Sequence, residues 1–159
     1  KQSFTLAGPH IANVLSFEGP VAQAAAELLR PLVDEVRVDD GPYSIVAQMV
    51  VMPRGITVTA VSPNYAHLGA TAQAIPRPET GGTATVSLLC VPCHRDEIPA
   101  HDIAAALATR FRVPCAASVG LHVERATEKD LRLMMGSVRT LIDRLVDCGE
   151  RAFREMGQR

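Results

Sequence analysis

The sequence lacks tryptophan, carries almost no net charge and has no long apolar run. A formal charge of −1 excludes a strong general attraction to nucleic acid or to an anionic membrane. No run is long enough to cross a bilayer, and the first residues lack the three-part layout of a signal peptide. We therefore expect neither a nucleic-acid partner nor a membrane partner. What remains is 159 residues, 47% of them hydrophobic, which fits one compact domain.

Cysteine is also scarce, with four residues at positions 90, 93, 115 and 148. Cys90 and Cys93 have the spacing of half a zinc knuckle or of a redox pair, but no second pair completes a knuckle. Cys90 also continues the alternating pattern of Val86 and Leu88, so plain buried thiols are favoured over metal or redox chemistry. Free thiols are typical of a reducing compartment, and we therefore expect a cytoplasmic protein.

Hydrophobic periodicity divides the chain into alternating strands and helices. Strands are expected at 33–38, 43–52, 56–61, 83–91 and 115–123, and helices at 21–29, at 98–111 and from 126 onward. Thr127 and Asp130 are suited to cap the last helix. We treat 1–159 as a single domain: an N-terminal segment with a helix (1–42), a core (43–146), and a solvated or frayed tail (147–159).

The segment from Pro63 to Pro78 has unusual chemistry for the interior of a domain. It lies between two expected strands and carries His67, Gly69 and several small side chains, followed by Arg77 between two prolines. Small residues allow a ligand to approach the backbone, and the prolines restrict the direction of Arg77. We interpret the segment as the floor and one wall of an anion-accepting pocket. The alternative is a short amphipathic strand with an exposed histidine.

Two later strand ends carry similar side chains. His94 and Arg95 precede the helix at 98–111, and Gly120 precedes His122 and Glu124. Because ligands gather at strand ends in sheets with helical crossovers, we expect one shared site. Simpler interpretations stay open: Asp96 and Glu97 would only cap the helix, the His122–Glu124 pair would be an exposed surface contact, and His10 would be a turn histidine.

The order of these motifs resembles the LpdD-like family. These proteins are small accessory subunits encoded with UbiD-type hydroxyarylic acid decarboxylases and are described as chaperones for prenylated flavin mononucleotide. The likeness covers about residues 45–146 and is carried by 66–70, 75–78, 94–97 and 120–124. The family tends to have Gly before the second His, Lys after it, and Asp near the end of the third motif. Here these positions are Cys93, Arg95 and Glu124.

The resemblance implies a cofactor site for prenylated FMN, or FMN, with no catalytic residue and no metal ligand assigned. Arg77 and Arg95 would hold the phosphate, because a guanidinium binds two oxygens at once. With only two tyrosines and four phenylalanines, the ring would need aliphatic walls such as Leu68, Ile75 and Leu121. The complete set implied to bind the cofactor is His67, Gly69, Arg77, His94, Arg95, Gly120, His122 and Glu124.

The resemblance further implies an α+β fold, a single domain whose mixed or antiparallel sheet has its helices packed mainly on one face. The partners would be a UbiD-like decarboxylase, a prenyl-flavin synthase as a second candidate, and another copy of the chain in a homodimer. The usual catalytic triads and nucleophile motifs do not occur in the sequence, which favours an accessory subunit over an enzyme. Two rivals stay open: a small metal- or His-dependent enzyme using His67, His94, His122 and Glu124, and a structural subunit that binds no flavin.

Overall fold

The computed structural model describes residues 31–78 and 81–157, so the helix expected at 21–29 and His10 lie outside the described residues. In chain order the elements are β1 (Leu32–Val38), the short 3₁₀ helix η1 (Gly41–Tyr43), β2 (Ile45–Met52), β3 (Gly55–Val61), β4 (Ala70–Ile75), β5 (Thr85–Cys90), α2 (Glu97–Phe111), β6 (Cys115–Gly120) and α3 (Glu128–Gly157). Among the described residues, neither helix combines the length and apolar character that crossing a bilayer requires.

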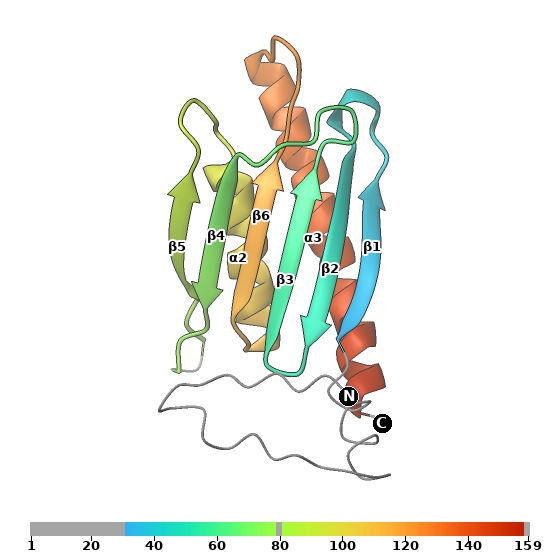
Figure 1. Ribbon diagram of the computed structural model, residues 1–159, viewed down its shortest axis with the longest axis vertical. Helices are drawn as coiled ribbons and strands as arrows, with labels where there is room; N and C mark the ends of the chain where they lie inside the picture. The colour runs from blue at the N-terminus through green and yellow to red at the C-terminus, as the bar shows by residue number, and fades with distance from the viewer. Residues whose placement is uncertain (1–30, 79–80, 158–159) are drawn as a thin grey trace, which may run out of the picture. The chain divides into compact units, whose positions relative to one another are not determined.

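The six strands form one mixed sheet in the order β1-β2-β3-β6-β4-β5. β2 and β3 form an antiparallel hairpin, whereas β3 and β6 are parallel neighbours in the centre. β6 enters the sheet between β3 and β4, which are consecutive in the sequence. Both helices cover the same face of the sheet (Figure 1). The predicted α+β fold, with a mixed sheet and helices on one face, is therefore confirmed.

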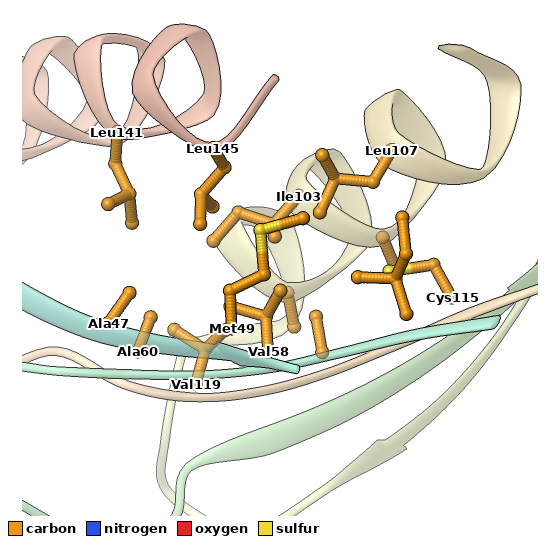
Figure 2. Close-up of a cluster of buried hydrophobic side chains, with 14 of the residues drawn as sticks. Ala47, Met49, Val58, Ala60, Ile103, Leu107, Cys115, Val119, Leu141 and Leu145 are labelled. Atoms are coloured by element: carbon orange, nitrogen blue, oxygen red, sulfur yellow. The ribbon is translucent and has the colours of Figure 1, made fainter. Parts of the chain in front are cut away.

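The core lies between this sheet face and the two helices (Figure 2). The inward positions of β2, β3 and β6 alternate with outward positions, as expected for strands with one covered face. Several inward side chains are alanines, and these small residues let the large leucines of the helices reach close to the sheet. Residues with no more than 1% of their surface exposed include Ala47, Met49, Ala60, Ile103, Leu107, Val119, Leu141 and Leu145.

The strand expected at 33–38 is confirmed as β1, whereas the frayed tail expected from residue 147 was wrong for the described residues up to 157. β1 pairs along its whole length with β2, starting from Leu32 opposite Val51, so the sheet includes residues assigned to the N-terminal segment. α3 continues to Gly157, and its Phe153 ring lies 5.1 Å from the ring of Phe111. The charged residues after position 147 suggested a tail. The apolar stripe nevertheless persists at helical spacing through the buried Cys148 and Ala152, and this packing holds the last turns in place.

The start of α3 has the predicted capping arrangement. The Thr127 amide donates to Asp130 Oδ2 (2.8 Å), and the Asp130 amide donates to Thr127 Oγ1 (3.3 Å). The hydroxyl of Tyr43 donates to the other carboxylate oxygen of Asp130 (2.6 Å), which connects the helix to η1. Hydrogen bonds from Thr127 and then Tyr43 lower the pKa of Asp130 to about 2.

The four thiols divide into two classes. Cys115 and Cys148 are buried, whereas Cys90 and Cys93 are exposed. The expectation that Cys90 belongs to the core was wrong, because it ends the edge strand β5, which leaves most of its side chains in solvent. Burial raises the pKa of Cys115 to about 12. Burial, helped by a hydrogen bond to Asp34, raises the pKa of Cys148 to about 11.

This division predicts the reactivity of the folded protein toward thiol reagents. Thiolate is the reactive form, so at pH 8 two of the four cysteines are expected to react quickly with a disulfide reagent and two slowly. Unfolding in guanidinium should make all four equally fast. Stopped-flow absorbance with peptide mapping would identify the sites; rapid labelling of Cys115 would contradict the assignment.

Candidate functional site

Three loops meet at one end of the sheet, shown at the top of Figure 1. They connect β3 to β4, β5 to α2, and β6 to α3. The Gly69 amide donates to the Val119 carbonyl (2.9 Å), the Val91 amide donates to the Gly69 carbonyl (2.8 Å), and the Ser62 amide donates to the Gly120 carbonyl (3.1 Å). These backbone bonds tie the first loop to the other two, so the three strand ends selected from the sequence do converge.

Two glycines make this convergence sterically feasible. A Cβ atom on Gly120 would lie 1.9 Å from the backbone oxygen of His67, and one on Gly69 would lie 1.7 Å from Asp96 Oδ2. From the sequence, small residues were expected to admit a ligand. In the structure, the groups that approach these two glycines belong to the protein itself, and the glycines bring the loops into contact.

Asp96 is the central residue of the site, although it was not predicted from the sequence. It is only 4% exposed and stands at the N-cap position of α2, yet its side chain makes no capping hydrogen bond. Instead, Oδ1 accepts the Leu121 amide (2.8 Å), and Oδ2 lies 3.5 Å from His67 Nε2 and 3.6 Å from His94 Nδ1. The interpretation of Asp96 as a cap was therefore wrong. The sequence held one indication of this: Glu97 already places an acid in the first turn of α2, so the helix did not need Asp96 for that purpose.

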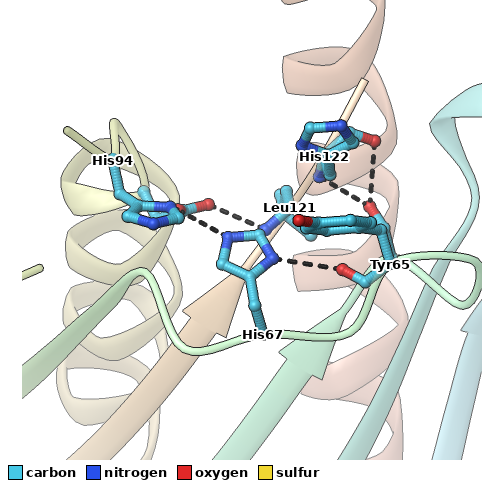
Figure 3. Close-up of polar contacts among 7 residues, drawn as sticks. Tyr65, His67, His94, Leu121 and His122 are labelled. Atoms are coloured by element: carbon cyan, nitrogen blue, oxygen red, sulfur yellow. Dashed lines mark hydrogen bonds and ion pairs between the residues drawn. The ribbon is translucent and has the colours of Figure 1, made fainter. Parts of the chain in front are cut away.

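The three predicted histidines lie in one cluster, together with Tyr65 (Figure 3). The ring centroids of His67 and His94 are 4.7 Å apart, and those of His67 and His122 are 6.4 Å apart. The Tyr65 ring stacks on His122 at 4.3 Å. His67 Nδ1 lies 3.1 Å from the backbone oxygen of Tyr65 and donates its hydrogen there. Tyr65 was missed because a lone exposed tyrosine in a loop has no distinguishing pattern.

Arg77 does not reach this cluster. Its Nε donates to Thr85 Oγ1 (3.1 Å), and its backbone oxygen accepts a hydrogen bond from Arg112. Arg77 follows Ile75, the last residue of β4, which pairs with Thr85, and β4 ends at the side of the sheet opposite the three loops (Figure 1). Six extended residues of β4 cover roughly 20 Å, so a guest held at the histidines is far from this guanidinium. The expectation that Arg77 shares the site is corrected for this reason.

Glu124 and Arg95 lie at the exposed edge of the histidine cluster. Strand β6 ends at Gly120 rather than at Val123, so Glu124 belongs to a loop. The Glu124 side chain is 80% exposed, and its Oε2 lies 3.4 Å from His122 Nε2. Arg95 is exposed beside His94. Cys93, at the position where the resemblance leads us to expect glycine, adopts the left-handed φ of 68° that glycine would favour. The carboxylate beside His67 and His94 is thus Asp96, not Glu124 as the rival enzyme model assumed.

A pocket of about 450 Å³ opens next to the cluster, between the start of α2, the loop after β6 and the first turns of α3. This volume lies within the range of small-molecule sites. Leu121 lines it as predicted, whereas Leu68 and Ile75 do not. The polar lining includes His94, Arg95, Asp96, Glu97 and His122, and the apolar lining includes Ile98, Pro99, Leu121, Val123, Leu131, Met134 and Met135.

Comparison with known proteins finds one matching family model and seven similar chains among solved structures. Residues 39–149 match the family model described as the prenylated flavin chaperone LpdD-like domain. One solved structure with a similar fold is described as a novel chaperone complex for yeast 20S proteasome assembly. The TM-score is 0.50 at 14% identity, over 74% of this chain and 95% of that chain. At this identity the likeness concerns the fold alone. No curated protein sequence matches the chain.

Proposed function

Because the chain belongs to the LpdD-like prenylated flavin chaperone family, we propose that it binds prenylated flavin mononucleotide and supports a UbiD-like aromatic acid decarboxylase. Family membership supports a chaperone role. The flavin and the decarboxylase partner are the specific parts of the proposal. A prenyl-flavin synthase as donor and a homodimeric state stay predictions that come from the resemblance.

The observation that supports flavin binding is a pocket lined by both polar and apolar side chains. Leu121, Leu131 and Met135 provide a surface for a flat ring and its prenyl-derived atoms. Among the polar lining residues, Arg95, His94 and His122 offer donors for a phosphate group. The single chain thus presents both chemistries that a flavin mononucleotide requires, within one cavity.

The exposure of the outer wall is suited to holding a guest and releasing it. Ile98 is 56% exposed and Leu131 is 50% exposed, so these two side chains border the pocket and also face solvent. A guest in this pocket keeps a solvent-facing side and leaves without unfolding of the core. That property is useful to a carrier, whereas an enzyme that protects a reactive intermediate needs to exclude water.

Co-expression with a prenyl-flavin synthase tests the proposal. The purified protein is expected to carry a flavin-type visible spectrum and to retain the nucleotide through gel filtration. Leu131→Glu should weaken retention at least about tenfold, because it places a carboxylate against an apolar ring. Leu133→Glu is the matched control: Leu133 is 41% exposed on the same helix and does not line the pocket.

Two results would count against the proposal. A colourless wild-type protein without bound nucleotide would remove the flavin from the function. Equal loss in Leu131→Glu and Leu133→Glu, with unchanged thermal stability, would move the binding site away from this pocket. Capture of a UbiD-like decarboxylase by the loaded chain, but not by the empty chain, would test the partner.

A further inference from the structure

We propose that His67, His94 and Asp96 form a binding site for a divalent transition-metal ion. Each residue offers one ligand atom, and the three atoms all lie within 4.8 Å of one another. The three side chains come from two different loops, and Gly69 is the residue that lets Asp96 approach the first loop. From the sequence, metal ligation was only the rival hypothesis with His67, His94, His122 and Glu124, and Asp96 was not part of that set.

The strongest indication is the ring nitrogen Nε2 of His67. It is buried and has no hydrogen-bond partner. Because Nδ1 donates to the backbone oxygen of Tyr65, the neutral ring carries its lone pair on Nε2. This lone pair faces Asp96 Oδ2 at 3.5 Å. In this neutral form two electron-rich atoms face one another, and a cation between them would satisfy both.

The hydrogen bonds around His67 and Asp96 are of the kind that hold metal-ligating side chains in place. A ligating histidine usually donates its other ring nitrogen to a backbone carbonyl or a carboxylate, which holds the ring in place. His67 does this through Tyr65. Asp96 accepts the Leu121 amide at Oδ1, which leaves Oδ2 directed toward the two imidazoles. Both ligands are therefore held by backbone groups before any ion arrives.

The distances are compatible with tetrahedral coordination. Bonds of about 2.0–2.2 Å place neighbouring ligand atoms roughly 3.3–3.6 Å apart. The two separations that involve Asp96 Oδ2 are 3.5 and 3.6 Å. The remaining separation, between the two imidazoles, is adjusted by rotation of His94, whose side chain is 34% exposed. Little rearrangement is required of the buried groups.

The donor set selects the class of ion. Two imidazole nitrogens and one carboxylate oxygen suit zinc and the neighbouring transition metals, whereas calcium and magnesium prefer oxygen ligands alone. Three protein ligands leave at least one coordination position open. Since His94 and Asp96 also line the pocket, that position faces the proposed guest. A phosphate oxygen could fill it in place of the distant Arg77; this last step rests on the proposed function.

Metal binding is tested directly with Zn²⁺ and Co²⁺ on chelator-treated full-length protein that carries no affinity tag. Calorimetry is expected to show one Zn²⁺ per chain, and Co²⁺ should give visible d–d bands. His94→Ala and Asp96→Asn should each weaken binding at least about a hundredfold. His101→Ala is the matched control, because His101 forms an exposed pair with Asp102 (3.0 Å) on the same helix and should leave binding unchanged.

The exposed cysteines give a second control. A Cys90→Ser/Cys93→Ser variant should bind Zn²⁺ as the wild type does. Loss of Zn²⁺ binding in this variant, or full Zn²⁺ binding in His94→Ala, would overturn the assignment. A wild-type protein that does not bind Zn²⁺ stoichiometrically would overturn it as well. Flavin titrations with and without chelator separate the two proposals. Metal binding without flavin binding would defeat the proposed function alone, and flavin binding without metal binding would defeat this inference alone.

Discussion

Gly120→Ala is expected to lower the free energy of unfolding by about 3 kcal/mol and the melting temperature by roughly 6 to 12 °C. The added Cβ would lie 1.9 Å from the backbone oxygen of His67, and a backbone atom cannot move aside as a flexible side chain does. Relief requires the loop after β3 to retreat from β6. That retreat would also separate His67 from Asp96, so metal and flavin binding should fall together with stability.

Gly136→Ala is the control for this experiment. Gly136 lies within α3, and a Cβ there would meet nothing within 4 Å. Alanine favours a helix over glycine by about 1 kcal/mol, so this variant should be more stable than the wild type. Thermal unfolding followed by circular dichroism would measure both. If Gly120→Ala melted at or above the wild-type temperature, the close approach of the two loops would be disproved.

Asp96→Ala is the second change with a large expected effect, a loss of about 2 to 3 kcal/mol. The carboxylate is buried, and its Oδ1 is the acceptor for the Leu121 amide. Removing it leaves this amide without an acceptor and disconnects the start of α2 from the end of β6. Since both segments border the pocket, the loop after β6 should also become more mobile, which hydrogen exchange at Leu121 and His122 would show.

Asp96→Asn separates the structural role of this residue from its role as a ligand. The side-chain oxygen of asparagine accepts the Leu121 amide, so most of the stability should return. Its amide group would then replace Oδ2, and an amide nitrogen is a poor metal ligand. We expect chemical denaturation to place Asp96→Asn close to the wild type and well above Asp96→Ala. Equal instability of the two variants would show that the charge itself, rather than the hydrogen bond, holds the loops.

Local patterns in the sequence predicted most of the secondary structure. Strands β2 and β3, the start of α3 at Thr127 and the apolar stripe of α3 follow from apolar patterning, capping chemistry and helical spacing, which all act within a few residues. The errors arose where contacts between residues far apart in the sequence decide whether a side chain is buried or a helix continues. Cys90 alternates like a core residue but ends an edge strand, and the charged end of α3 stays ordered through Ala152 and Phe153.

The candidate site could be predicted only in part for the same reason. His67, His94 and His122 were selected because imidazoles at strand ends are uncommon in a core, and the structure brings them together. Arg77 was selected on equal grounds, but the direction of β4 places it at the other end of the sheet. Asp96 was interpreted as a helix cap, because an acidic residue is common at the start of a helix. That interpretation did not consider the residues of the neighbouring loops.

The amino-acid sequence by itself determined the elements, the family resemblance and the residue types that a phosphorylated guest would need, since these depend on neighbours along the chain. Only the tertiary structure decided which of those residues share a site. β6 inserts between β3 and β4, and this order, set by long-range strand pairing, brings Gly120 under His67 and the Leu121 amide to Asp96. Contacts of that kind depend on how the whole sheet is assembled, and no short stretch of sequence encodes them.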